Sequence, residues 1–469
     1  MAIQFYNTLT KKKEEFAPQE KGVVRMYNCG PTVYSYPHIG NFRAFVFADV
    51  LRRYLEYRGF DVKQVMNITD VGHITHDADE GEDKMELQAK KEKRDPWQIA
   101  AHYGGIFLDL RKQLGFADAL AHPKATDHIP EMLAMIEKLI EKGHAYVVGH
   151  NVYYSVASFP NYGKLSGNIT EDLEAGARIE PHPDKKDPRD FALWKHDPHH
   201  VMQWDSPWGK GFPGWHIECS AMSMKYLGET LDIHTGGEDN IFPHHECEIA
   251  QSEAANGKLF CKMWMHARFL LVDGQKMSKS LGNFYTVEDV FKHGVTAPAL
   301  RWGLATSHYR QQMNFSWESM QVAQGSVDKL IEFRRRLSDA HGAATLELVK
   351  PIVEKARKDF ERGMDDDLNV SEATAALFTL AREVNRLDPN PQAAAFVRDA
   401  FDKLDTVFNI GSALPDVFTP EEQRLLDARA AARASKNWDD SDRLRKELEA
   451  KGVLVEDSPR GQRPRRARK

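Results

Sequence analysis

The chain has 469 residues, of which 42% are hydrophobic and 28% charged, with a formal net charge of −6. This composition is ordinary for a globular protein of about three domains, and it excludes a protein that attracts nucleic acid with its whole surface. Four cysteines are too few for a disulfide framework, which favours a cytoplasmic location. Because the chain has neither a long apolar run nor the pattern of a signal peptide, we expect no membrane partner.

Residues 22–70 are predicted to form a strand, a helix and a second strand. Val23 to Tyr27 have the pattern of a short buried strand, and apolar side chains recur at helical spacing over 40–58. Gly59 stands where a helix commonly ends in a glycine, and 61–68 supplies the second strand. Such a unit predicts a parallel sheet with crossover helices.

The segment between the first strand and the helix, Gly30 to Asn41, contains a candidate phosphate site. Ligands of parallel sheets bind at the carboxyl ends of strands, where helix N-termini attract phosphates. His38 and Asn41 lie about one helical turn apart and could reach one phosphate group, while Gly40 would let a nucleotide approach the backbone. This segment alone is also compatible with a histidine that only begins the helix.

The composition changes between residues 131 and 200, where Gly, Pro, Asp and His cluster and indicate a loop-rich insertion. Strand and helix patterns return after it, and a mainly helical part follows. The predicted parts are two halves of a Rossmann-like domain at 1–130 and 201–315, a connective insertion at 131–200, a helical bundle at 316–410, and a small C-terminal region at 411–469.

A second phosphate-binding candidate is the loop Lys276-Met277-Ser278-Lys279-Ser280. It follows a strand-like stretch at 269–272 and a turn at Asp273-Gly274. Two lysines in one loop can cover the β and γ phosphates of a nucleotide and stabilise the charge on departing pyrophosphate. One lysine pair is common in exposed loops, but both segments in this order are far more specific.

The C-terminal third contains clear helix signals and a basic end. Apolar residues from Ala373 to Leu387 alternate spacings of four and three residues, and Thr419-Pro420-Glu421-Glu422 is a strong helix start. Arginines and a lysine, without acids, occupy 458–469, and Arg334 to Arg336 form another basic cluster. Both clusters suit phosphate contacts or a solvated surface, and we expect the tail to be mobile unless RNA orders it.

The two loops resemble the HIGH and KMSKS signatures of class I aminoacyl-tRNA synthetases. The second is matched in full, and the first has Asn41 as its last residue, a variant that cysteinyl members of the class use. Nearly the whole chain is similar to cysteinyl-tRNA synthetases. That similarity is carried by the segments Tyr27 to Tyr34, Asn67 to Asp70, Gly214 to Met222, Asp232 to Gly237, Phe242 to Glu246, and Met364 to Asn369.

The resemblance implies an α/β fold, with a Rossmann-like parallel-sheet catalytic domain split by an insertion and followed by a mainly α-helical C-terminal region. It implies ATP-dependent activation of L-cysteine and transfer of the cysteinyl group to tRNA(Cys), with 411–469 binding the anticodon. One Zn²⁺ per chain would select the substrate thiol, and Mg²⁺ would accompany ATP. Nothing in the sequence suggests an obligate dimer, so we expect a monomer.

The resemblance also implies roles for individual residues. His38, Asn41, Lys276 and Lys279 would be catalytic, and His38, Gly40 and Lys279 would bind ATP. The zinc ligands would be Cys29, Cys219, His244 and Glu248. The amino-acid pocket would be lined by Thr69, Trp215, His234 and Asp239.

Several alternatives stay open at this point. Spacing alone also allows His245, Glu246 or Cys247 as ligands, although Cys247 is better interpreted as a buried thiol like Cys261, and His234 could be a core histidine. The chain could instead be a ligase that joins activated cysteine to an amino-sugar, or a zinc-held RNA-binding protein without catalysis. The long C-terminal part with its basic end argues against the first, and the intact signatures argue against the second.

Overall fold

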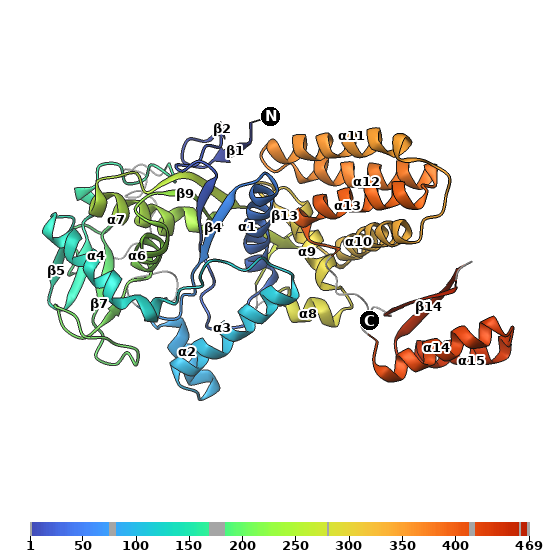
Figure 1. Cartoon of the computed structure of the whole chain (residues 1–469). Coiled ribbons are helices and arrows are strands. Elements are labelled where there is room, and N and C mark those ends of the chain that lie inside the picture. The colour runs from blue at the N-terminus through green and yellow to red at the C-terminus, as the bar shows by residue number, and fades with distance from the viewer. Residues whose placement is uncertain are drawn as a thin grey trace.

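The computed structural model of the protein describes residues 2–74, 81–167, 183–278, 281–411, 418–458 and 461–466. An α/β part and a bundle of long helices lie side by side, and a small unit with the last two helices projects beneath the bundle (Figure 1). This arrangement confirms the predicted fold class. None of the helices among the described residues is long and apolar enough to cross a membrane.

A four-stranded parallel sheet forms the centre of the α/β part. Its strands lie in the order β10-β9-β3-β4, so the two halves of the chain meet where β3 pairs with β9. The carboxyl ends of these two central strands therefore lie together, at the edge where parallel sheets bind ligands. The strands are β3 (Val23–Asn28), β4 (Asp61–Met66), β9 (Leu231–Gly237) and β10 (Cys261–Ala267).

Helices cover both faces of this sheet (Figure 1). The predicted first helix is confirmed as α1 (Ile39–Tyr57), and Gly59 follows its end with a φ of 92°. Alternate residues of β3 divide the core: Met26 packs in the cluster that contains α1, and Tyr27 in the cluster that contains α6. The other helices of this part are α2 (Lys84–Glu92), α3 (Pro96–Gln113), α6 (Trp215–Leu227) and α7 (Glu246–Asn256).

The range 131–200, predicted as a loop-rich insertion, has irregular segments at 183–190 and 196–200 but also contains regular elements that the composition did not predict. Helix α4 (Ile129–Glu141) leads into an antiparallel sheet in the order β5-β6-β7-β8. Its strands are short and alternate with Gly, Pro and Asp turns, so their apolar pattern is hard to recognise in the sequence. They are β5 (Ala145–Val148), β6 (Asn151–Tyr154), β7 (Phe191–Lys195) and β8 (Phe212–Pro213).

Short elements connect the central sheet to the helical part. The predicted strand and turn are confirmed: β11 (Leu270–Val272) pairs with β12 (Gln275–Lys276) across Asp273 and Gly274, which both have positive φ. The remaining short elements are β1 (Gln4–Asn7), β2 (Lys12–Glu15), α8 (Val287–Lys292), α9 (Ala297–Thr306) and β13 (Met313–Phe315).

Four long helices form the bundle, and their apolar faces continue the core that contains α1. The apolar pattern from Ala373 to Leu387 is confirmed as part of α12. The helices are α10 (Trp317–Ser338), α11 (Leu346–Asp365), α12 (Val370–Leu387) and α13 (Pro391–Phe408).

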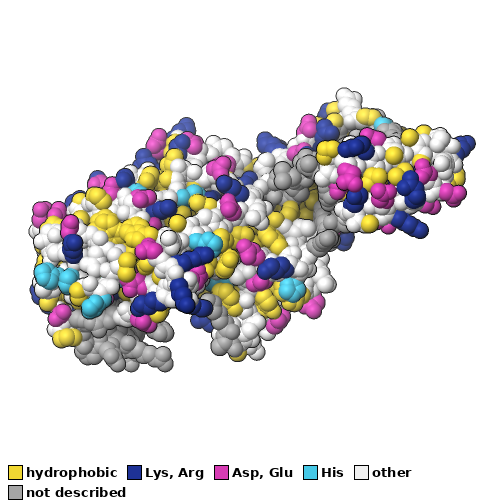
Figure 2. Space-filling model, turned by 90° about the horizontal axis from the view of Figure 1, so that it is seen from below, with side chains coloured by type: hydrophobic (Ala, Val, Ile, Leu, Met, Phe, Trp, Pro, Cys, Tyr) yellow, Lys and Arg dark blue, Asp and Glu magenta, His cyan; other side chains and the backbone are white. Residues whose placement is uncertain are grey.

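The C-terminal unit has a small core of its own, formed by residues such as Leu426, Leu448 and Val453. The predicted helix start at Thr419 is confirmed, with a capping box to Glu422. In the tail that was expected to be mobile, Gly461–Arg466 pair with Val453–Ser458 as an antiparallel hairpin, since backbone pairing does not depend on the charge of the side chains. The elements are α14 (Pro420–Ala434), α15 (Trp438–Ala450), β14 (Val453–Ser458) and β15 (Gly461–Arg466). Acidic and basic side chains are interspersed on the face of this unit that Figure 2 shows.

Candidate active site

Four side chains that can bind a metal meet at the carboxyl ends of β3 and β9. Cys29 directly follows β3, and its amide donates a hydrogen bond to the carbonyl of Thr235 in β9 at 3.1 Å. Cys219 lies on α6, while His244 precedes α7 and Glu248 lies on it. One donor atom from each of the four lies within 4.8 Å of the others. The fold thus brings together the residues predicted as zinc ligands.

Charges within this first donor group compensate one another. The sulfurs of Cys29 and Cys219 are 4.0 Å apart, and Nε2 of His244 is 3.1 Å from Oε1 of Glu248. Burial raises the pKa of Cys219, but hydrogen bonds from Cys29 and His244 outweigh burial and set it at about 6. Burial also raises the pKa of Glu248, whereas the charges of His234 and His244 lower it to about 2. The thiolate of Cys219 and the carboxylate of Glu248 are the forms that bind a metal, whereas burial and the neighbouring Cys219 raise the pKa of Cys29.

A second donor group overlaps the first. It consists of Cys29, His234, His245 and Glu248, whose donor atoms also lie within 4.8 Å of one another. Nε2 of His245 is 3.1 Å from the sulfur of Cys29, and Nε2 of His234 is 2.9 Å from Oε2 of Glu248. The other ring nitrogen of His245 contacts His266 at 2.8 Å. His245, which spacing left open as a ligand, therefore lies beside the first group.

The other two residues that spacing left open have different partners. The carboxylate of Glu246 accepts hydrogen bonds from the amides of Leu165 and Ser166, at 3.1 and 2.9 Å. The sulfur of Cys247 is 3.4 Å from the hydroxyl of Tyr162. Neither residue belongs to a donor group among the described residues, and Cys247 is the buried thiol that the sequence predicts.

The four residues predicted to line the amino-acid pocket have different surroundings. Trp215 and Asp239 line a cavity of about 560 Å³, whose lining also includes Cys29. Thr69 and His234 are not among the residues that line it. Thr69 donates a hydrogen bond to Glu218 at 2.8 Å, and His234 is fully buried. The structure thus places only two of the four at the cavity wall.

The cavity wall also includes His73 and Lys84, which the sequence did not predict there. The ring of Trp215 stacks between His73 and His244, with centroid distances of 4.2 Å to each. His73 also contacts the hydroxyl of Thr32 and the ammonium group of Lys84, each at 2.7 Å. Both His73 and Lys84 line the cavity. His73 comes after β4 and Lys84 begins α2, so the contact between them arises only in the folded chain.

His38 and Asn41 begin α1 as a reciprocal cap. Nδ1 of His38 accepts a hydrogen bond from the amide of Asn41, and Oδ1 of Asn41 accepts one from the amide of His38, both at 3.2 Å. This is a capping box that places both side chains at the cavity wall. A Cβ atom on Gly40 would lie 2.9 Å from Nδ1 of His38 and 3.0 Å from Cε of Met277. Glycine at this position therefore lets the two signatures pack together.

The second signature reaches the same cavity. Lys276 and Met277 line it, and the segment that follows them is bonded to α1, where the amide of Ile39 donates to the carbonyl of Tyr285 at 3.0 Å. Lys279 and the serine after it lie outside the described residues. The fold brings the two signatures together, although they are more than 200 residues apart in the sequence.

One cavity joins the metal-binding end to the two signatures. Its lining includes Cys29, Trp215, His38 and Lys276. Thiol and imidazole donors at one end suit a metal that binds sulfur, and a helix N-terminus and lysine at the other suit phosphates. The arrangement can hold a small amino acid with its side chain at the metal and its carboxylate towards a nucleotide.

Comparison with known proteins covers the whole chain. The family model described as "tRNA synthetases class I (C) catalytic domain" matches residues 15–325. The DALR domain matches 359–410, and the cysteinyl-tRNA ligase anticodon binding domain matches 416–465. A cysteine–tRNA ligase of Thermus thermophilus is 44% identical over 484 residues, with 99% of both chains covered. Another from Desulfitobacterium hafniense is 43% identical over 487 residues, with the same coverage.

Solved structures with the same fold are more distant in sequence. Mycobacterium tuberculosis methionyl-tRNA synthetase in complex with methionyl-adenylate has a TM-score of 0.59 at 13% identity, covering 87% of this chain and 94% of that chain. The LeuRS–tRNA–LeuAMS ternary complex of Agrobacterium radiobacter has a TM-score of 0.60 at 11% identity, covering 85% of this chain and 86% of that chain. Full-length identity of this level and the matching catalytic and anticodon-binding models lead to one conclusion: the chain belongs to the cysteine–tRNA ligase family of class I aminoacyl-tRNA synthetases.

Proposed function

We propose that this protein activates L-cysteine with ATP to cysteinyl-adenylate and transfers the cysteinyl group to tRNA(Cys), with zinc selecting the substrate thiol. The observation that carries the proposal is the single cavity that joins the donor group around Cys29 to the two signatures. Similarity to cysteine–tRNA ligases over the full length supports the same reaction.

The first donor group fits a zinc ion. Two thiols, an imidazole and a carboxylate are donor types that zinc prefers, and Cys219, His244 and Glu248 are buried from water. Zinc held there would supply a coordination position for the substrate sulfur, and a thiolate is a far better ligand for it than the hydroxyl of serine. The stacked ring of Trp215 between His73 and His244 would keep the wall next to His244 in place.

Activation would take place at the other end of the cavity. The capping pair holds the side chains of His38 and Asn41 at the N-terminus of α1, where the helix dipole favours phosphate. Lys276 and Lys279 would stabilise the negative charge that develops as pyrophosphate leaves. ATP would bring Mg²⁺ with it. Asp239 at the cavity wall suits the ammonium group of the amino acid, and Thr69 and His234 would act from behind the wall.

Transfer would need tRNA bound along the helical part. The unit from α14 to β15 matches the anticodon-binding model, and we propose that it contacts the anticodon of tRNA(Cys). The proposal includes a monomeric chain and a cytoplasmic location, as the sequence predicts.

Two assays test the proposed function. Cysteine-dependent exchange of pyrophosphate into ATP should be observed with the purified protein, and tRNA(Cys) should become charged with cysteine. Exchange without charging would favour the amino-sugar ligase, which the full-length similarity does not favour. If protein that contains one zinc per chain shows neither pyrophosphate exchange nor charging of tRNA(Cys), the proposal is contradicted.

A further inference from the structure

Helix α1 carries the first signature at its N-terminus, and two charged side chains further along it are buried. Arg43 is 2% exposed and Asp49 is 1% exposed. A buried charge destabilises a protein unless partners compensate it, so the contacts of these two residues define what α1 is fixed to.

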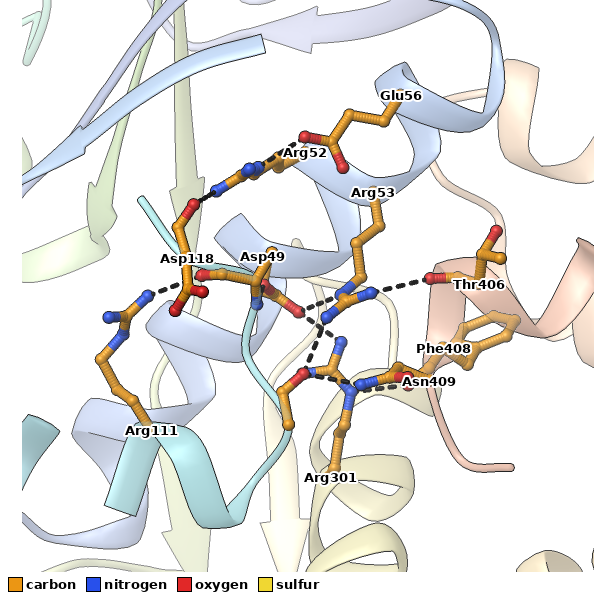
Figure 3. Close-up of polar contacts among 12 residues, drawn as sticks. Asp49, Arg52, Arg53, Glu56, Arg111, Asp118, Arg301, Thr406, Phe408 and Asn409 are labelled. Atoms are coloured by element: carbon orange, nitrogen blue, oxygen red, sulfur yellow. Dashed lines mark hydrogen bonds and ion pairs between the residues drawn. The ribbon is translucent and has the colours of Figure 1, made fainter. Parts of the chain in front are cut away.

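Asp49 is the centre of a buried ion network. Figure 3 shows the guanidinium groups of Arg53, from α1, and Arg301, from α9, pointing to its carboxylate. Oδ2 of Asp49 accepts a hydrogen bond from Arg53 at 2.8 Å and another from Arg301, while Oδ1 accepts the amide of Ala117 at 2.8 Å. Burial raises the pKa of Asp49, but the two arginine charges outweigh burial and leave that pKa below its usual value.

The same two arginines bind the C-terminal end of α13 (Figure 3). Nε of Arg301 donates to the carbonyl of Phe408 at 2.5 Å, and Arg53 donates to the carbonyl of Thr406 at 3.2 Å. The last carbonyls of a helix have no partner within the helix and carry its negative dipole end, so a cation there is favourable. Asp49, Arg53 and Arg301 therefore join α1, α9 and α13 at one point.

Arg43 makes the corresponding contact nearer the signature. It donates to the carbonyl of His308 at 2.8 Å and to that of Leu304 at the end of α9. At the other side of this segment, the amide of Ile39 bonds to Tyr285. The segment from 285 to 308 begins five residues after the second signature, Lys276 to Ser280. Both of its ends are bonded to α1, through Tyr285 and His308.

We propose that Asp49 and Arg301 are positioning residues for activation. By fixing α9 and α13 to α1, these two residues set the position of His38 and Asn41 relative to the second signature. The inference rests on the proposed function, because it assumes that both signatures act on ATP. A merely structural ion network would affect stability alone, whereas displacement of reacting groups by about 1 Å can lower a rate by about 10²-fold.

The matched comparison is Arg301→Met against Arg334→Met. Arg334 on α10 forms a two-point ion pair with Asp402 of α13, at 2.5 and 2.9 Å, so its loss also removes an ion pair that α13 makes with another helix. Arg301→Met should lower the kcat of cysteine-dependent pyrophosphate exchange about 10-fold or more per active site. Zinc content and the KM for cysteine should not change, and Arg301→Lys should recover part of the rate. Arg334→Met should have the same kcat of pyrophosphate exchange as the unmodified protein.

Amide hydrogen exchange gives a readout besides activity. The amide of Ile39 should exchange faster in Arg301→Met and not in Arg334→Met. If Arg301→Met does not fold, Asp49→Asn makes the same comparison, since an asparagine can still accept the amide of Ala117. An unchanged kcat and an unchanged Ile39 amide in the folded variant would overturn the inference. Absence of cysteine-dependent pyrophosphate exchange in the unmodified protein would instead overturn the proposed function.

Discussion

The two ends of the active-site cavity are built from different ranges of the sequence. At the metal end, Cys29 and Cys219 are 190 residues apart and meet because α6 packs against β3. At the nucleotide end, His38 and Asn41 are three residues apart and cap one helix through each other's backbone. The contrast shows that short motifs identify the nucleotide end, whereas tertiary packing selects which donors meet at the metal end.

Burial differs between the ends as well. Cys219, His244 and Glu248 are at most 1% exposed, while His38 is half-buried and Lys276 is exposed. Buried charged donors depend on one another, since removing one leaves the others uncompensated. We therefore expect substitutions to have their largest effects at the metal end.

The largest effect is expected for Cys219→Ser. The variant should lose zinc and bind cysteine more than ~100-fold more weakly, beyond the ~10–100-fold loss typical of residues that only support a ligand. Metal analysis and a cysteine titration measure both. Cys247→Ser is the matched control, because Cys247 bonds to Tyr162 and belongs to neither donor group. Equal zinc loss in both variants would contradict the assignment.

At the nucleotide end, Lys279→Ala should slow formation of cysteinyl-adenylate by about 10²-fold or more, the scale for one preorganised charge. The affinity for ATP should change less, because the charge counts most as pyrophosphate leaves. Rapid-quench measurement of adenylate formation separates the two effects. A near-normal rate would remove Lys279 from the mechanism.

A smaller effect should distinguish the overlapping donor groups. His245→Ala should lower zinc affinity by about 10-fold, as for a supporting residue, because Cys29 would keep its three other partners. His244→Ala should abolish zinc retention under the same competition with a chelator. If His245→Ala loses zinc and His244→Ala keeps it, the ion lies in the second donor group.

The smallest effect on activation is expected from removing the C-terminal unit. A chain that ends at Gly411 keeps the hydrogen bonds of Ile410 and Gly411 to Asp405, so α13 should remain intact. Pyrophosphate exchange should stay nearly normal, while charging of tRNA weakens and loses part of its dependence on salt. Parallel loss of both activities would show that this unit supports the catalytic fold.

Much of the fold could be predicted where the pattern is long or the capping chemistry local. The strand before Cys29, helix α1, the amphipathic α12 and the cap at Thr419 all follow from such signals. The antiparallel sheet β5 to β8 could not, because its strands have two to five residues and depend on pairing across the chain. The C-terminal hairpin was not predicted, because the basic residues of 458–469 indicate solvated side chains and carry no information on the pairing of the backbone.

In the candidate site too, some features can be predicted from the sequence and others depend on tertiary contacts. The resemblance supplied the four donors that meet at Cys29, but spacing could not separate them from His245, which lies in contact with Cys29. His73 and Lys84 were missed because their places at the cavity wall depend on contacts of His73 with Thr32, Trp215 and Lys84, which only the tertiary structure creates.

Zinc at the metal end is proposed to select cysteine, and one titration tests this selection directly. Pyrophosphate exchange with cysteine and with serine is measured on metal-free protein to which zinc is returned in known amounts. We predict one zinc per chain, with preference for cysteine over serine that is small without metal and rises in proportion to bound zinc. Protein without stoichiometric zinc, or metal-free protein that still strongly prefers cysteine, would contradict the claim.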